Sequence, residues 1–166
     1  MTIRAIFAGS FDPITYGHLD IINRSLGLFD QVIVALGVNM AKKTLFSVEE
    51  RVALTEKVIA EELPSLSDHV HVVTYDGLTV TLAKQFGSCC LVRGVRTPTD
   101  YEYEYNIALI NSKIAPGLET VLLMADHNKS AISSSAVKEL AKFKCDVSKF
   151  VPPAVVSAIS QKYNEV

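Results

Sequence analysis

The chain has 166 residues, and 16 lysines and arginines against 18 aspartates and glutamates give a net charge of −2 and a pI of about 6.1. This length predicts a single domain over residues 1–166, long enough to bury roughly two thirds of its unfolded surface. The charge balance excludes a global positive field for nucleic acid or an anionic membrane, so any anion site must be local.

Runs rich in valine and isoleucine alternate along the chain with runs of helical period, a pattern typical of parallel strands joined by crossover helices. The helix after residue 46 has the clearest start, because Ser47 and Glu50 form a capping box. The pattern predicts an α/β fold with a doubly wound, five-stranded parallel sheet. In chain order the expected elements are strand 3–8, helix 17–28, strand 31–36, helix 47–63, strand 70–75, helix 78–86, strand 89–92, helix 100–114, strand 121–124, helix 133–143 and helix 153–163.

Polar residues follow four of the predicted strands. In such sheets, ligands bind outside the carboxyl ends of the strands, where the strand order reverses. There the sequence places GSFDPITYGH after the first strand, Lys42 and Lys43 after the second, Arg93 and Arg96 after the fourth, and residues 126–135 after the fifth. A histidine, lysines, arginines and three serines at a helix start suit a phosphate ligand.

Each of these residues also has a purely structural interpretation. His18 could be a surface residue near a helix start, and the two lysines could be solvated charges. Arg93 and Arg96 could pair with Asp100 and Glu102. Ser133–Ser135 could be a plain N-cap, because serine accepts hydrogen bonds from free helix amides.

Several other classes of site lack their signature. The chain has no P-loop pattern and no glycine-rich dinucleotide fingerprint after the first strand. His69 and His71 have no cysteine or carboxylate at metal-ligand spacing, so no metal held by the protein alone is expected.

The cysteines and the apolar runs bear on location. Cys89, Cys90 and Cys145 are odd in number and suit reduced, buried thiols, so a reducing cytoplasm is expected. The N-terminal apolar stretch is too short for a signal peptide, and no run reaches about 18 apolar residues, so no membrane partner is expected. Apolar residues nevertheless make up 49% of the chain, which predicts some surface covered by a second copy.

Two motifs carry a family resemblance. GSFDPITYGH and AISSSAVKEL resemble the signature motifs of the nucleotidyltransferase superfamily that includes the class I aminoacyl-tRNA synthetases. With AKKTLFSVEERVAL and LVRGVRTPTDYEYEYNIALIN, the likeness extends over nearly the whole chain to the bacterial phosphopantetheine adenylyltransferase family. It implies a Rossmann-like nucleotidyltransferase fold, a homohexamer and a Mg²⁺-assisted reaction of ATP with 4′-phosphopantetheine that yields dephospho-coenzyme A and pyrophosphate.

The same resemblance implies roles for individual residues. His18 matches the catalytic histidine that stabilises the transition state. Ser10, Lys42, Thr79 and Arg93 match residues that bind the acceptor substrate. The ATP-binding positions are matched by Ser10, Phe11, His18, Gly94, Val95, Arg96, Glu104, Lys129, Ser130, Ala131, Ile132, Ser133, Ser134 and Ser135.

The chain departs from the family pattern at three of its positions. Ser10 replaces a usual threonine, Tyr16 replaces a small polar residue, and Lys129 replaces an aromatic residue whose role it does not inherit. Two competing functions stay open at this point. One is a nicotinate or nicotinamide mononucleotide adenylyltransferase or a cytidylyltransferase of the same superfamily; the other is a nucleotide-binding module without catalysis.

Overall fold

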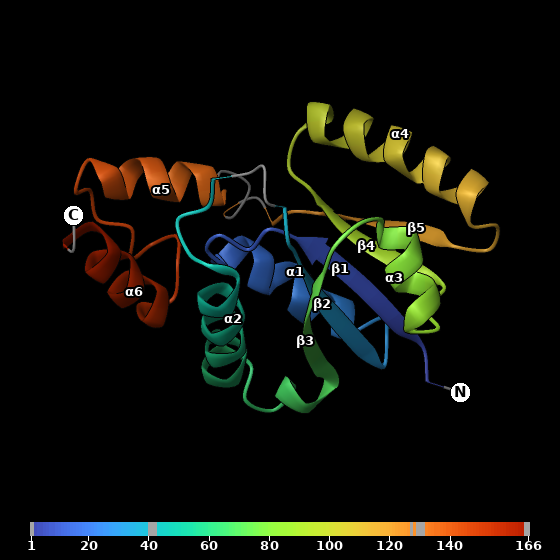
Figure 1. Ribbon diagram of the computed structural model, residues 1–166, viewed down its shortest axis with the longest axis horizontal. Coiled ribbons are helices and arrows are strands. Elements are labelled where there is room, and N and C mark those ends of the chain that lie inside the picture. Colours follow the sequence, from blue (N-terminus) through green and yellow to red (C-terminus); the bar gives the residue numbers. More distant parts are fainter. Residues whose placement is uncertain (1, 40–42, 127, 129–131, 165–166) are drawn as a thin grey trace.

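The computed structural model describes residues 2–39, 43–126, 128 and 132–164. Within these residues, strands and helices alternate for most of the chain and two helices follow the last strand (Figure 1). The elements are β1 (Arg4–Gly9), α1 (Tyr16–Leu26), β2 (Gln31–Gly37), α2 (Val48–Glu62), the 3₁₀ turn η1 (Ser67–His69), β3 (Val70–Tyr75), α3 (Thr79–Gln85), β4 (Cys90–Val95), α4 (Pro98–Ile114), β5 (Glu119–Met124), α5 (Ser134–Lys142) and α6 (Pro153–Asn164).

The strands form one parallel sheet in the order β3-β2-β1-β4-β5. β1 pairs with β2 on one side, with Ile6 opposite Ile33, and with β4 on the other, with Phe7 opposite Val92. The chain winds outward in one direction from β1 to β3 and in the other from β4 to β5. The order therefore reverses between β1 and β4, and the expected five-stranded parallel fold is confirmed.

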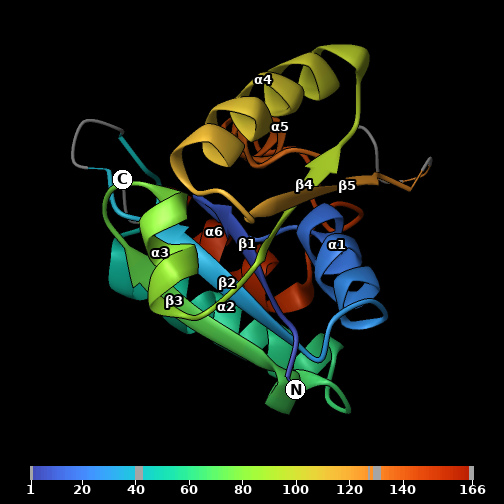
Figure 2. The same ribbon diagram turned by 90° about the vertical axis from the view of Figure 1, so that its right-hand side faces the viewer.

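Helices cover both faces of the sheet (Figure 2). Phe7, Val34 and Val92 point to the face that packs against α1, α2, α5 and α6, where the larger core lies. Ile6, Ile33 and Leu91, the alternate residues, point to the face that packs against α3. This alternation is why the central strands are apolar throughout, because both of their faces are buried.

Two expectations need correction. All three cysteines are free thiols, as expected. Only Cys90 is buried, however, because Cys89 and Cys145 are exposed. Cys90 is the first residue of β4, whereas Cys89 precedes the strand and lies outside the buried part of the sheet. Helix α4 begins at Pro98, because Thr97 caps it through the Asp100 N–H and a proline fits the first helical position.

Candidate functional site

His18 lies at the third position of α1 and takes part in its capping. Thr15 is the N-cap of this helix. Its backbone N–H donates a hydrogen bond to Nδ1 of the His18 ring at 3.0 Å. A nitrogen that accepts this bond carries no proton, so the proton of the neutral ring is on Nε2. The T-x-G-H motif thereby holds an imidazole with its Nε2–H available as a donor.

The surroundings of His18 keep it uncharged. The ring lies 4.7 Å from the Phe11 ring, centroid to centroid. Burial, with Arg96 and Arg93 adding repulsion, lowers the pKa of His18 from 6.5 to about 4. The side chain is therefore a neutral hydrogen-bond donor at neutral pH.

His18 faces a hollow at the carboxyl ends of β1 and β4, which we call the switch-point cavity. This is the position at which open α/β sheets bind ligands. Gly94 stands on its wall, where a β-carbon would come within 3.1 Å of the Ile21 side chain. The cavity is lined by Phe7, Ala8, Gly9, Ser10, Thr15, Gly17, His18, Ile21, Arg93, Gly94, Arg96, Asp100, Glu104, Ala125, Ile132, Ser133, Ser134 and Ser135.

The start of α5 forms one side of this cavity. Ser133 is the N-cap and accepts from the Ala136 N–H at 3.1 Å, as the structural interpretation expects. The Ser134 hydroxyl donates to the Pro13 carbonyl at 2.8 Å and ties α5 to the loop after β1. A helix start still presents free amides and the positive end of the helix dipole, which favour an anion.

Arg93 pairs with Glu104 rather than Glu102. Its Nε and Nη2 donate to the two carboxylate oxygens at 2.8 and 2.7 Å, and its Nη1 donates to the Ala8 carbonyl. Arginine has five N–H donors, so two of those of Arg93 have no partner among the described residues and are available to a ligand. Burial opposes the charge of Arg93, but the hydrogen bonds and charge of Glu104 raise its pKa overall. Arg96 pairs with Asp100 at 3.2 Å, as the structural interpretation expects.

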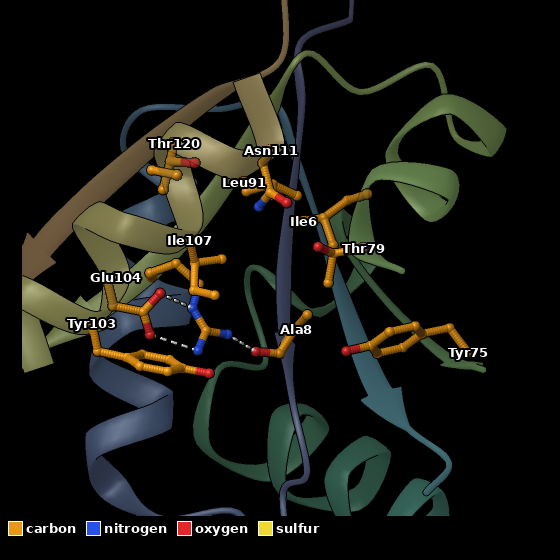
Figure 3. A pocket seen from close by; sticks show the side chains of 12 residues that line it. Ile6, Ala8, Tyr75, Thr79, Leu91, Tyr103, Glu104, Ile107, Asn111 and Thr120 are labelled. Atoms are coloured by element: carbon orange, nitrogen blue, oxygen red, sulfur yellow. Dashed lines mark hydrogen bonds and ion pairs between the residues drawn. The ribbon is translucent and has the colours of Figure 1, made fainter. Parts of the chain in front are cut away.

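A second hollow, the inner cavity, lies between the sheet, α3 and α4 (Figure 3). Its floor is Ile6, Ala8 and Leu91, and the hydroxyl groups of Tyr75 and Tyr103 point into it from opposite sides. Its other lining residues are Thr79, Arg93, Glu104, Ile107, Ala108, Asn111 and Thr120. The wall combines apolar side chains with hydroxyl, amide and charged groups, so it can bind a ligand that has both apolar and hydrogen-bonding parts.

The two cavities meet at Ala8, Arg93 and Glu104, which line both. The free N–H groups of Arg93 are therefore next to both hollows. A ligand in either hollow would therefore lie next to the same guanidinium, and His18 is on the switch-point side.

The structure brings most of the sequence-predicted residues to these cavities but not all. Thr79 lines the inner cavity, and the switch-point cavity collects Ser10, His18, Gly94, Arg96, Ile132 and the three serines. Val95 is buried in the sheet, and the Phe11 side chain packs behind His18. Lys42, Lys129, Ser130 and Ala131 lie outside the described residues.

Sequence reasoning missed Tyr75, Tyr103, Asn111 and Thr120 in the inner cavity. A signal was present for α4, because Tyr103, Ile107 and Asn111 recur every four residues and so share one helix face. No comparable pattern marks Tyr75 or Thr120, which reach the cavity only through the pairing of the strands.

Comparisons with known proteins now bear on this site. Residues 6–140 match the family model described as cytidylyltransferase-like. A phosphopantetheine adenylyltransferase of Desulforamulus reducens is 50% identical over 158 residues, covering 95% of each chain. One of Caldanaerobacter subterraneus is 43% identical over 161 residues, covering 97% of this chain and 98% of the relative. The chain belongs to the phosphopantetheine adenylyltransferase family. Its members are nucleotidyltransferases, so this chain is an enzyme of that class.

Solved structures add support for the fold of this family member. A nicotinic acid mononucleotide adenylyltransferase of Plasmodium falciparum superposes with a TM-score of 0.71 over 99% of this chain and 97% of that one, at 16% identity. A bifunctional NMN adenylyltransferase/ADP ribose pyrophosphatase of Francisella tularensis gives a TM-score of 0.77 over 99% of this chain and 52% of that one, at 14% identity. These likenesses identify the Rossmann-like nucleotidyltransferase fold alone.

Proposed function

We propose that the chain transfers the adenylyl group of ATP to 4′-phosphopantetheine, giving dephospho-coenzyme A and pyrophosphate. The acceptor phosphate attacks the α-phosphorus of ATP; a new P–O bond forms, and the bond to the bridging oxygen of pyrophosphate breaks. The observation that carries the proposal is the pair of cavities joined at Arg93: such a reaction needs a nucleotide and a long, mostly uncharged acceptor to meet at one phosphate.

In this proposal ATP occupies the switch-point cavity. Ser10, Gly94, Arg96 and the start of α5 surround its phosphates, and His18 donates from Nε2 to the α-phosphate as charge develops. An acceptor phosphate is already ionised at neutral pH, so the site needs no strong general base. Catalysis then reduces to positioning and charge stabilisation.

The acceptor arm occupies the inner cavity, with Thr79 beside it and its phosphate at the free N–H groups of Arg93. Lys42 is a second proposed contact for that phosphate on the family resemblance. Glu104 holds the guanidinium in a fixed plane, and a fixed donor loses less entropy on binding.

Mg²⁺ belongs to the proposal as a cofactor that arrives with ATP. When bound, it neutralises part of the triphosphate charge. Asp100 and Glu104, the carboxylates at the cavity, are paired with arginines. Ser10 offers a hydroxyl oxygen as a ligand, and phosphate and water oxygens would supply the rest, as is common for this ion.

We also propose a homohexamer in the cytoplasm. The 17-residue helix α4 buries one residue, Glu104, and leaves Tyr101, Leu109, Ile110 and Ile114 exposed. A second copy that covers this face would account for the apolar content, and closed symmetry is the rule for such assemblies. The free thiols and the proposed ATP substrate favour the cytoplasm. No helix in the described part of the chain is long and apolar enough to span a membrane.

One assay tests the activity. The protein is incubated with ATP and Mg²⁺ and, separately, 4′-phosphopantetheine, nicotinamide mononucleotide, nicotinate mononucleotide or glycerol 3-phosphate, and pyrophosphate is followed; the same panel is repeated with CTP. Pyrophosphate from ATP with 4′-phosphopantetheine alone supports the proposal. Release with another acceptor, or none with any, contradicts it.

A further inference from the structure

Arg51 is a charged residue inside the core, at the fourth position of α2. Only 2% of it is exposed. Buried arginines are normally paired with a carboxylate, because an unpaired charge is costly to bury. The ion pairs within the described residues do not include Arg51, and its Nε has no hydrogen-bond partner there.

The partners that Arg51 does have are two backbone carbonyls. Its Nη1 donates to the Ser10 oxygen at 2.6 Å and to the Gly37 oxygen at 3.1 Å. Gly37 ends β2, and Ser10 directly follows β1. One guanidinium therefore fixes the chain where two neighbouring strands leave the sheet, and Ser10 lines the switch-point cavity.

The bond to Ser10 sets the orientation of the peptide that joins it to Phe11. This peptide is trans, so its carbonyl and its N–H point in opposite directions. The carbonyl faces Arg51, and the Phe11 N–H faces away from it. Within the described ranges, the Phe11 N–H donates no hydrogen bond to a backbone carbonyl.

Phe11 holds a backbone conformation that needs outside support. Its φ is 46°, in the left-handed region that residues other than glycine rarely adopt. The ring is held by an edge contact with Phe7, at 5.4 Å between centroids, and by the contact with His18. Arg51 holds the Ser10 carbonyl of the peptide that precedes Phe11, so the Phe11 ring and this peptide group are both fixed.

We propose that Arg51 is a positioning residue for adenylyl transfer. By holding the Ser10 carbonyl it directs the Phe11 N–H toward the phosphates in the switch-point cavity, beside the Nε2–H of His18. A backbone donor fixed in this way stabilises developing charge without reorganising during the reaction. The inference rests on the proposed function for its substrate, although phosphate binding alone can test the geometry.

The chain offers a matched control on the same helix. Thr55 lies one turn after Arg51, is fully buried, and its hydroxyl also has no partner within the described part of the protein. Its hydroxyl therefore makes no hydrogen bond to the described residues of the loops after β1 and β2. Thr55→Ala should therefore lower the melting temperature while leaving kcat within twofold of the parent.

Arg51→Met removes the charge and the donors but keeps an apolar side chain. We expect kcat to fall about 10–100-fold, with the KM of the acceptor within threefold. A folded Arg51→Met with kcat within threefold of the parent overturns the proposal. So does an equal loss of kcat in Thr55→Ala, because the effect would then follow stability.

Arg51→Lys decides the case if Arg51→Met does not fold. It keeps the charge and a donor, but a single ammonium cannot reproduce the fixed plane of a guanidinium. We expect it to fold and to lose at least fivefold in kcat, and an unchanged kcat overturns the proposal.

Amide spectra separate this inference from the proposed function. The seven phenylalanines are labelled with ¹⁵N, and inorganic pyrophosphate is added without acceptor. The Phe11 amide should shift downfield in the parent and Thr55→Ala, and by less than a quarter as much in Arg51→Met. No shift in the parent, or equal shifts in the parent and Arg51→Met, overturns the role of Arg51. A parent that is inactive with 4′-phosphopantetheine contradicts only the proposed function.

Discussion

At the scale of single residues, the proposed chemistry depends on which nitrogen of His18 carries the proton. The capping bond from Thr15 to Nδ1 leaves the proton on Nε2. The motif TYGH could be recognised in the sequence, but the tautomer could not, because it follows from a bond that only the folded turn makes. The partner of Arg93 was equally hidden: Glu102 and Glu104 are both close in sequence, and the α4 geometry selects Glu104.

Removing the His18 ring should affect turnover more than binding. If Nε2–H stabilises charge that exists mainly in the transition state, His18→Ala should lower kcat about 10²–10³-fold, or roughly 2.7–4 kcal/mol. The measurement is steady-state kinetics beside calorimetric titration with ATP, with circular dichroism as the check on folding. A folded variant within threefold of the parent would exclude the catalytic role.

The lowered pKa of His18 predicts a pH-dependent stability. Between pH 6.5 and about 4 the unfolded chain binds a proton that the folded chain does not, so the free energy of unfolding falls as the pH falls through this window. The part due to His18 is at most about 3 kcal/mol. Urea unfolding of the parent and His18→Gln at pH 7 and pH 4.5 isolates the contribution of His18, because the other titrating groups are the same in the two proteins. Equal losses in the two proteins would contradict the assignment.

Arg93 should govern the acceptor more than ATP. Its two free N–H groups stand beside the inner cavity, and Arg93→Ala removes a charge-assisted contact with the acceptor phosphate. We expect the acceptor KM to rise by roughly one to two powers of ten, well beyond the change in the ATP KM. Thr120→Val, on the far wall of the same cavity, is the control for altered packing; equal effects of Arg93→Ala on both substrates would refute the role.

At the scale of elements, local sequence signals predicted the secondary structure well. The exceptions are residues whose burial is decided by tertiary contacts. The capping box of Ser47 and Glu50 marks the start of α2 in both sequence and structure. The buried face of that helix contains Val58 and Ile59, but also Arg51 and Thr55. Periodicity cannot identify such residues, because a buried polar side chain is recognised by its partners and not by its spacing.

Asp12 shows the same limit, since it joins three elements that are distant in sequence. It is 1% exposed and accepts from the Leu45 and Phe46 N–H groups at 2.9 Å and from Lys138 Nζ at 2.7 Å. The carboxylate therefore connects the loop after β1 with the segment before α2 and with α5.

Removing this carboxylate should destabilise the whole protein. Asp12→Ala leaves two backbone amides and an ammonium without their acceptor, so the free energy of unfolding should fall by about 2–4 kcal/mol in urea. Asp146 is the matched control, because it accepts two bonds from Ser148 but is exposed. Asp146→Ala should cost less than about 1 kcal/mol. Similar costs for the two variants would show that burial does not determine the effect.

At the scale of the whole molecule, the alternation of strands and helices predicted the sheet and the edge at which the switch-point cavity lies. It did not predict the inner cavity, which is lined by residues of the sheet, α3 and α4, the last of which buries only Glu104. How closely a helix approaches a sheet is decided by the side chains of several elements together. A single sequence pattern does not contain that information.

The exposed face of α4 predicts the effect of a charge on assembly. Light scattering of the parent should give six copies of the 18.1 kDa chain. Ile110→Lys should lower this mass, because a lysine is costly to bury in an apolar interface. Leu28→Lys, an exposed apolar position at the end of α1, should leave the mass unchanged. A parent that scatters as a monomer at micromolar concentration contradicts the assembly.

Because Arg93 and Glu104 line both cavities, we expect the ligands proposed for the two cavities to affect each other's binding. A phosphate that draws the guanidinium toward one hollow changes the donors presented to the other. By linkage, whatever the first ligand does to the affinity of the second, the second does to the first by the same factor. We therefore expect a substitution at Glu104 to alter the cooperativity between the proposed substrates as well as the affinity for either one.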